Sequence, residues 1–191
     1  GLEASLGDID KTVTRISRII KGLRNISRDA SEEPCAEVVL ADVFSDVLAV
    51  CAEKFRNHQV ELRLDLARDE HPVVEGRRVQ LSQVVLNLLS NAYDAVEKLE
   101  GPKWVELQVR VAESDLVIAV RDSGPGVPAH IHEKIFNPFF TTKDVGKGTG
   151  LGLSLSKAIV DKHGGELRLE TSGGHTEFTV RLPLKSSLRV A

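Results

Sequence analysis

The chain has 191 residues, of which 41% are hydrophobic, so it can build one domain with an appended segment, or two small domains, around a packed core. Its 25 Lys and Arg residues nearly balance its 28 Asp and Glu residues, and the net charge of −3 argues against a binder of nucleic acid or anionic membranes that works by bulk charge. Two cysteines exclude a disulfide-rich scaffold and a four-thiolate zinc site, and charged residues interrupt every apolar run before it reaches transmembrane length. Because the chain begins at Gly1 and lacks Met, we expect a fragment or a processed chain.

The first predicted element is a helix over residues 6–28. Apolar residues recur on one of its faces at steps of three and four, with Lys and Arg opposite. This apolar stripe consists of Ile9, Val13, Ile16, Ile20, Leu23 and Ile26. The spacing favours a coiled-coil seam or a helical bundle, and the alternative is an ordinary amphipathic helix packed on its own domain. Residues 29–36 are polar and contain a proline, which predicts a linker.

The rest of the chain mixes predicted helices and strands. In chain order, we expect a strand over 37–40, a helix over 41–57 with Val43, Val47, Val50 and Phe55 facing inward, a strand over 60–66 with one buried face, a helix over 77–98, paired strands over 104–111 and 115–121, a helix over 149–163 and a hairpin of 166–171 and 176–182. These elements predict an α+β fold. We expect a two-layer sandwich of a mixed, mostly antiparallel sheet with helices on one face.

Asn87 and Asn91 lie four residues apart in the predicted helix over 77–98, so both amides fall on one face. Asn is a poor residue for a helix interior, because its side chain competes for backbone hydrogen bonds. Its amide offers an oxygen for a hard cation and nitrogen donors for phosphate. The pair therefore predicts a cation or phosphate site, and the alternatives are a solvated polar face or a buried amide network.

Asp122 follows a predicted apolar strand and precedes Gly124 and Gly126. The sheet fixes a carboxylate at the end of a strand, and the glycines let a ligand approach the backbone. Because an ionised carboxylate only accepts hydrogen bonds, it suits an exocyclic amine such as that of adenine. A plain turn is the alternative.

Three of the six Phe residues lie within five positions of the segment 136–143, and Lys143 ends this segment. We interpret the segment as a mobile flap with aromatic anchors, in which Lys143 offers a point charge to phosphate. The alternative is a small satellite core under a long loop.

Ten of the 15 glycines lie between Gly124 and Gly174, and four of them alternate with other residues over 146–152, directly before a predicted helix. Such glycines expose unpaired N–H groups to an anion, and the helix dipole adds attraction. The spacing is that of neither a Walker A loop nor a Rossmann loop, and a flexible linker is the alternative. The four motifs together span 66 residues in one order. This order favours a nucleotide with its base at Asp122, its phosphates at the glycines and a divalent ion beside the Asn pair.

The segments NLLSNAYDAV, DSGPGVP, IFNPFFTTK and GKGTGLGLSLSKAIVDKHGG resemble the N box, first glycine box, F box and second glycine box of sensor histidine kinases of two-component systems. The segments FFTTK and GTGLGLS are most similar to those of the nitrogen-regulation type of kinase. The resemblance implies the Bergerat fold of the GHKL ATPases. It divides the chain into part of the dimerisation and phosphotransfer domain, its second helix, over 1–30, a linker over 31–36 and a catalytic ATP-binding domain over 37–191.

The resemblance also implies which residues bind ATP and Mg²⁺. Asn87 and Asn91 would serve the metal and act in catalysis with Lys143, and Asp122 would hold the adenine amine. The other implied ATP contacts lie beside Asn91, in a lid over 127–148 with the loop before it, and at the second glycine box. They are Tyr93, Asp94, Gly124, Gly126, Val127, Ile135, Phe136, Phe140, Thr141, Thr142, Gly146, Lys147, Gly148, Thr149, Gly150, Leu151, Gly152 and Leu153.

By the same resemblance, the domain would transfer the ATP γ-phosphate to a histidine on the dimerisation helix, for relay to a response-regulator aspartate. The implied partners are ATP, a second copy of the chain through the dimerisation domain, and a response regulator. We expect no nucleic acid, no membrane contact in this part of the protein, and a cytoplasmic location even if the full-length protein is membrane-anchored.

None of the six His residues lies in the H-E-x-x-N/T-P type of motif that carries the phosphoacceptor in this family. His132 precedes Glu133, but the pair falls in the expected lid, so we expect all six to be ordinary surface residues and the acceptor helix to lie upstream. The alternatives are another Bergerat-fold ATPase or serine kinase, or a nucleotide-sensing scaffold. Hydrolases of that superfamily carry a catalytic Glu where this chain has Asn87, which disfavours hydrolysis.

Overall fold

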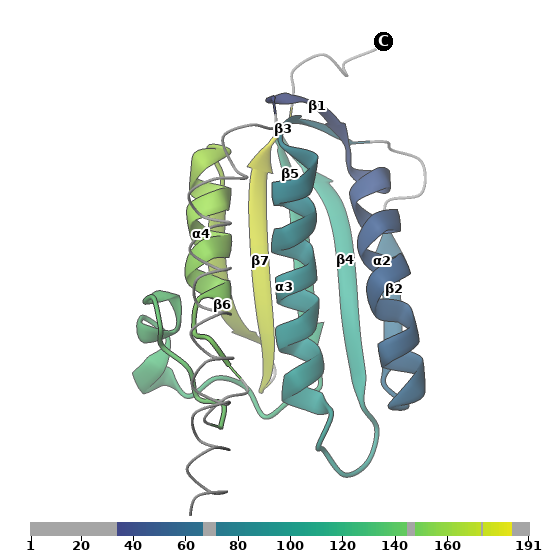
Figure 1. Ribbon diagram of the computed structural model, residues 1–191, viewed down its shortest axis with the longest axis vertical. Coiled ribbons are helices and arrows are strands. Elements are labelled where there is room, and N and C mark those ends of the chain that lie inside the picture. The colour runs from purple at the N-terminus through teal and green to yellow at the C-terminus, as the bar shows by residue number, and fades with distance from the viewer. Residues whose placement is uncertain (1–33, 67–71, 145–147, 173, 185–191) are drawn as a thin grey trace, which may run out of the picture.

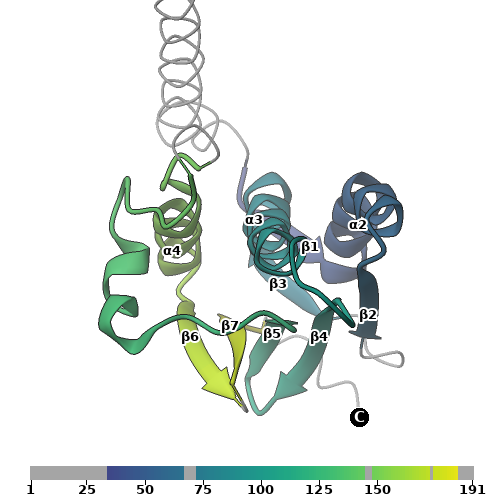
Figure 2. The same ribbon diagram turned by 90° about the horizontal axis from the view of Figure 1, so that it is seen from below.

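The structure is a computed structural model that describes residues 34–66, 72–144, 148–172 and 174–184. The helix predicted over 6–28, its apolar stripe and most of the predicted linker lie outside these residues. The described part forms two layers, a five-stranded sheet and three helices that cover one of its faces (Figures 1 and 2). This arrangement confirms the predicted α+β class.

The larger sheet has the strand order β2-β4-β5-β7-β6. Its strands are β2 (Glu61–Leu66), β4 (Trp104–Ala112), β5 (Asp115–Asp122), β6 (Glu166–Ser172) and β7 (His175–Pro183). Within this sheet, β2 and β4 run parallel and the other neighbours run antiparallel. The helices are α2 (Leu40–Asn57), α3 (Arg78–Val96) and α4 (Gly152–Lys162). A small antiparallel pair, β1 (Ala36–Val39) with β3 (Val73–Gly76), lies at one end of the larger sheet (Figure 1).

The hydrophobic core lies between the sheet and the helices. In β4, buried Val105, Leu107 and Val109 alternate with residues on the open face of the sheet. In the central strand β5, the whole run 116–120 is buried. The middle helix, α3, buries its apolar face, with Leu88 and Leu89 fully buried. Close packing of this face holds α3 rigidly against the sheet, so the residues on its polar face also have fixed positions.

Two predictions about the helices were wrong. Val50 was expected to face inward, but it is 67% exposed, and Cys51 takes the inward position instead. The reason is that Val47, Cys51 and Phe55 follow one another at steps of four, and Val50 lies off that stripe. The helix expected from 149 begins only at Gly152, because Gly150 has a φ of +67°, which a right-handed helix cannot contain.

Two strand predictions also need correction. The strand over 60–66 forms, but Leu64 is 46% exposed, since β2 lies at the edge of the sheet and has a neighbour on one side only. The short strand β3 was missed. It has four residues and pairs with β1 across a separation of 34 positions or more, so no local alternation marks it.

Candidate functional site

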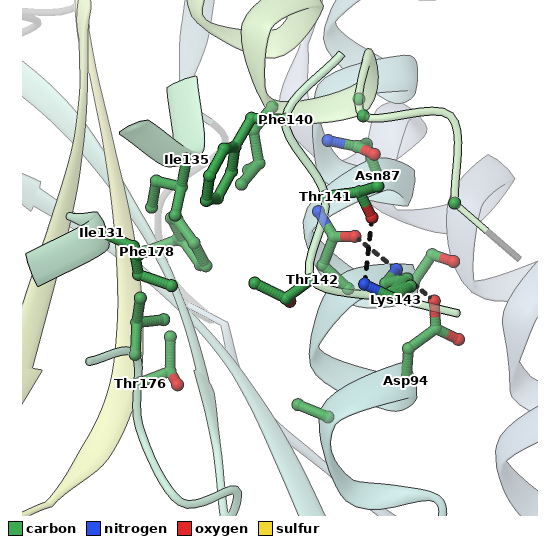
Figure 3. Close-up of a pocket in the computed structure, with 18 of the residues that line it drawn as sticks. Asn87, Asp94, Ile131, Ile135, Phe140, Thr141, Thr142, Lys143, Thr176 and Phe178 are labelled. Atoms are coloured by element: carbon green, nitrogen blue, oxygen red, sulfur yellow. Dashed lines mark hydrogen bonds and ion pairs between the residues drawn. The ribbon is translucent and has the colours of Figure 1, made fainter. Parts of the chain in front are cut away.

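A cavity of about 670 Å³ lies between α3, the ends of β5 and β7, and the segment that leads from Asp122 to the start of α4 (Figure 3). All four sequence motifs contribute to its wall. The predicted site residues found there are Asn87, Asn91, Asp94, Asp122, Gly126, Val127, Ile135, Phe140, Thr141, Thr142, Lys143, Gly148, Thr149, Gly150, Gly152 and Leu153. The fold therefore brings the motifs together around a space whose size suits a small-molecule ligand.

Asp122 ends β5 and presents a buried carboxyl group to this cavity, with only 2% of the residue exposed. The backbone N–H of Gly124 donates to Asp122 Oδ1 at 2.8 Å. Burial raises the pKa of Asp122 to about 6, although the Gly124 N–H, the nearby His175 and a hydrogen bond with the Thr176 side chain each lower it. A Cβ on Gly124 would lie 2.5 Å from Asp122 Oδ1, so this turn requires glycine.

Apolar side chains surround one part of the cavity. Figure 3 shows Ile131, Ile135 and Phe178 on the side opposite Asn87 and Lys143. Ile131 and Ile135 come from two single-turn 3₁₀ helices, 129–131 and 134–136, while Phe178 comes from β7. A hydrogen-bonding group beside such walls is shielded from water, so it selects strongly for a matching partner.

The two amides of the Asn pair share one face of α3, as predicted, and each already has a partner. Asn87 Nδ2 donates to Ser156 Oγ on α4 at 2.9 Å. Asn91 Oδ1 accepts from Lys143 Nζ at 3.1 Å. A Cβ on Gly152 would overlap the Asn87 amide, so glycine at the start of α4 lets this helix approach α3 closely.

Lys143 lies inside the cavity, not in open solvent. Its Nζ atom pairs with Asp94 Oδ2 at 2.5 Å, and its backbone N–H donates to Thr141 Oγ1 at 3.1 Å (Figure 3). The contact with Asp94 holds the end of the Phe segment against α3, and the contact with Thr141 is local to the segment. The ammonium group therefore lies next to the Asn pair, where the sequence analysis expected a phosphate-binding charge.

The described part of the glycine loop requires glycine at two positions. Gly150 has a positive φ, and a Cβ there would overlap the backbone of Phe139. Gly152 opens α4 beside Asn87. This leaves the N-terminal turn of α4 facing the cavity through Gly152 and Leu153, where unpaired N–H groups attract an anion. Gly146 and Lys147 lie outside the described residues.

Four predicted site residues do not reach the cavity wall. The Tyr93 ring faces α2, with its centroid 5.3 Å from that of Phe55. Phe136 packs against the core, and Leu151 is buried at the start of α4. Gly124 supports Asp122 through its backbone N–H. Tyr93 lies two positions after Asn91, and two steps along a helix rotate a side chain by about 200°, away from the face that carries Asn91.

The wall also contains residues that the sequence analysis missed: Ser90, Ala95, Pro125, Pro128, Ile131, Thr176 and Phe178. The helical period of Asn87, Asn91 and Asp94 was a sufficient signal for Ser90, which shares their face. Thr176 lies directly opposite Asp122 in the β5–β7 pair. That register comes from the whole sheet, and nothing in the local sequence marks it.

Two histidines expected to be ordinary surface residues make structural hydrogen bonds. His132 Nε2 lies 2.7 Å from the Val127 carbonyl oxygen, a contact within the first turns of the lid segment. The Arg77 backbone N–H donates to His163 Nε2 at 3.1 Å, and His163 Nδ1 lies 2.8 Å from the Ile159 carbonyl oxygen. His163 thereby joins the end of α4 to the start of α3, and both histidines are half-buried.

The cavity suits a molecule with an amine-bearing planar ring and a polyanionic tail. Asp122 supplies a buried acceptor among apolar side chains, and Lys143 with the start of α4 supplies a cation and N–H donors. Within the described residues, no three His, Cys, Asp or Glu side chains gather into a metal site. Among the described helices, none combines the length and apolar character that crossing a membrane requires.

Comparison with known proteins agrees with this chemistry. Residues 76–186 match the family model described as histidine kinase-, DNA gyrase B- and HSP90-like ATPase. The chain is 37% identical over 189 residues to the two-component sensor PprA of Pseudomonas aeruginosa, an alignment that covers 96% of this chain. It spans only 20% of the length of that curated relative.

Two solved structures have a similar fold and a sequence identity above 25% to this chain. The nucleotide-free catalytic domain of the histidine kinase ThkA matches with a TM-score of 0.69 and 31% identity, over 78% of this chain and 97% of that domain. ThkA in complex with the response regulator TrrA matches with a TM-score of 0.73 and 26% identity, over 93% of this chain and 50% of that one.

Proposed function

This chain belongs to the family of histidine kinase-, DNA gyrase B- and HSP90-like ATPases, and we propose that its residues 37–191 are the ATP-binding catalytic domain of a sensor histidine kinase. The proposed activity is transfer of the ATP γ-phosphate to a histidine on the dimerisation helix, for relay to an aspartate of a response regulator. One observation carries the proposal: the buried Asp122 carboxylate and the Lys143 ammonium line the same cavity.

In this proposal, Asp122 recognises the adenine base. Its carboxylate accepts a hydrogen bond from the exocyclic amine, while Ile131, Ile135 and Phe178 contact the faces and edges of the ring. The amine is bound best while Asp122 is ionised, because protonation turns one of the two acceptor oxygens of the carboxylate into a donor. The pKa of about 6 leaves Asp122 mostly ionised at neutral pH.

The phosphates would lie between α3 and the start of α4, where Lys143 offers a charge. Mg²⁺ takes oxygen ligands, and at phosphate sites it draws few of them from the protein and the rest from phosphates and waters. The amide oxygens of Asn87 and Asn91 are the protein oxygens that we propose for it, and the described residues have no acidic cluster that would hold the metal alone. When bound, the ion would neutralise phosphate charge during transfer.

The residues of this chain have a positioning task in the transfer, since phosphoryl transfer needs alignment and charge neutralisation more than covalent protein chemistry. A neutral imidazole nitrogen is already a nucleophile, so no general base has to come from this domain. With Asn87 at the place where hydrolases of the superfamily have Glu, transfer is favoured over hydrolysis.

The proposal extends to partners that lie outside the described residues. The predicted helix over 6–28 would contribute to a homodimer through the dimerisation domain, and a response regulator would receive the phosphate. The ThkA complex with TrrA supports the second of these partners by analogy. We also propose that the domain works in the cytoplasm.

A label-transfer experiment tests this function. The chain is mixed with a separate dimerisation domain that carries the phosphoacceptor histidine, together with Mg²⁺ and γ-labelled ATP. We expect label on the dimerisation domain that survives base and is lost in acid, as phosphohistidine is. Release of free phosphate without protein labelling would overturn the kinase proposal in favour of a hydrolase.

A further inference from the structure

Asp94 on α3 lies between two lysines that come from different elements. Its Oδ2 atom pairs with Lys143 Nζ at 2.5 Å, and its Oδ1 atom lies 3.8 Å from Lys54 Nζ on α2. The side chains of Asp94 and Lys143 are 29% and 34% exposed. Because the pair is partly shielded from water, its attraction is stronger than that of a pair on the open surface.

This pairing affects what Lys143 can do in the cavity. Asp94, Asn91 and Lys143 line the same space (Figure 3), and the Lys143 ammonium donates to both of the other side chains. A polyphosphate entering the cavity must therefore compete with Asp94 for Lys143. It also meets the negative charge of Asp94 at close range.

Lys54 gives Asp94 a second cation from outside the cavity. Its Nζ atom lies 3.8 Å from the centroid of the Tyr93 ring, a cation–π contact that keeps the ammonium close to Asp94. Lys54 is 48% exposed and does not belong to the cavity wall. If Lys143 turns to a phosphate, Lys54 remains to compensate the Asp94 charge.

We propose that Asp94 is a positioning residue that holds Lys143 away from the phosphates in the ligand-free protein, and that Lys54 acts through Asp94 to ease the release of Lys143. The proposal rests on the proposed function in one respect, that the cavity binds ATP with its phosphates near Lys143. It adds that a residue of α2, outside the cavity, sets the affinity for the phosphates and leaves the affinity for the base unchanged.

Two changes in the affinity for Mg-ATP follow, together with one case in which no change is expected. Asp94→Asn frees Lys143 and removes a negative charge, so the affinity for Mg-ATP should rise about fivefold, a typical size for a partly shielded ion pair. Lys54→Gln strengthens the hold of Asp94 on Lys143, so the affinity for Mg-ATP should fall about threefold. In the Asp94→Asn background, Lys54→Gln should have no effect, since it acts only through Asp94.

The experiment is an NMR titration of the unchanged chain, both single variants and the double variant, with Mg-ATP and with adenosine at fixed ionic strength. Adenosine has the base and no phosphates, so its affinity should be the same in all four proteins. Asp161→Asn is the matched control: it removes the same charge from α4, where Asp161 pairs with Lys157 away from the cavity. It should leave both affinities unchanged.

Unchanged or weaker Mg-ATP binding by Asp94→Asn would overturn the inference, as would an equal change for adenosine. If Asp94→Asn does not fold, Lys54→Gln still decides: a threefold loss for Mg-ATP alone supports the inference, and no loss overturns it. Failure of the unchanged protein to bind either ligand would overturn the proposed function together with this inference. Binding of both ligands with no difference among the variants would overturn this inference alone.

Discussion

The substitution Asp122→Asn separates the stability of the fold from ligand binding. Asp122 is 2% exposed at the end of β5, and burial raises its pKa to about 6. The Gly124 N–H, His175 and Thr176 offset only part of this effect. At neutral pH the folded protein therefore carries an ionised carboxylate that is less well solvated than in the unfolded chain, which lowers the free energy of unfolding.

The size of this effect follows from the two pKa values. In the unfolded chain Asp122 has its ordinary pKa of 3.8. The difference between 3.8 and about 6 corresponds to about 3 kcal/mol of lost stability at neutral pH. Because the folded-state pKa is the higher one, the native protein binds the proton more tightly, and this group's contribution to stability rises as the pH falls from about 7 to about 4.

Asn is nearly isosteric, keeps an acceptor for the Gly124 N–H and carries no charge. We therefore expect Asp122→Asn to raise the free energy of unfolding by up to about 3 kcal/mol at about pH 8, and this advantage to shrink by about 2 kcal/mol at about pH 4.5. ATP affinity should fall at least about a hundredfold, because rotation of the amide cannot satisfy both the Gly124 N–H and the adenine amine.

Urea unfolding of the variant and the unchanged protein at both pH values measures the stability change, and calorimetry measures ATP binding. Asp115→Asn, at the opposite end of β5, controls for the loss of an Asp from the same strand. A variant that is less stable than the unchanged protein by the same amount at both pH values would contradict this prediction, since the ionised carboxylate would then stabilise the fold.

Other substitutions test the cavity wall and the core separately. Asn91→Ala removes the acceptor for Lys143 and a proposed metal ligand. Calorimetry should therefore show at least about a tenfold loss of ATP affinity with Mg²⁺ and a clearly smaller loss without Mg²⁺. Equal losses with and without Mg²⁺ would contradict the metal assignment. Gly150→Ala places a Cβ against the backbone of Phe139 at a residue with a positive φ. ATP affinity should fall about tenfold, while the thermal midpoint of unfolding shifts by less than about 5 °C. Unchanged ATP affinity would show that the loop adapts to the new side chain. Leu88→Ala should lower the free energy of urea unfolding by about 3 kcal/mol, because the side chain is fully buried, and a loss below about 1 kcal/mol would contradict the packing of α3.

The parts of the fold that the sequence could predict are those whose signal is local. The helix expected over 77–98 forms as α3 over Arg78–Val96, because its apolar residues repeat over five turns against one buried surface. β3 and the exposure of Leu64 depend on which strands become neighbours, and that information is spread over distant segments. The start of α4 was predicted three residues too early, because the positive φ of Gly150 goes with the close approach of Phe139, which lies outside the local sequence of the helix.

The parts of the candidate site that could be predicted are also the local ones. The glycine motifs and the Asn pair could be identified because each is continuous in sequence, and each reaches the cavity. The Asn87–Ser156 hydrogen bond and the Asp94–Lys143 pair join residues 69 and 49 positions apart, so only packing brings them together. Thr176 and Phe178 were missed because β7 enters the site through the register of the sheet.

A crystal structure of the chain with Mg²⁺ and a non-hydrolysable ATP analogue would show directly whether the cavity holds ATP in the proposed orientation. We expect the adenine amine within hydrogen-bond distance of the Asp122 carboxylate. We expect the phosphates beside Lys143 and the N-terminal turn of α4. A nucleotide bound outside this cavity, or bound inside it with its base at Lys143 and its phosphates at Asp122, would overturn the proposed binding mode.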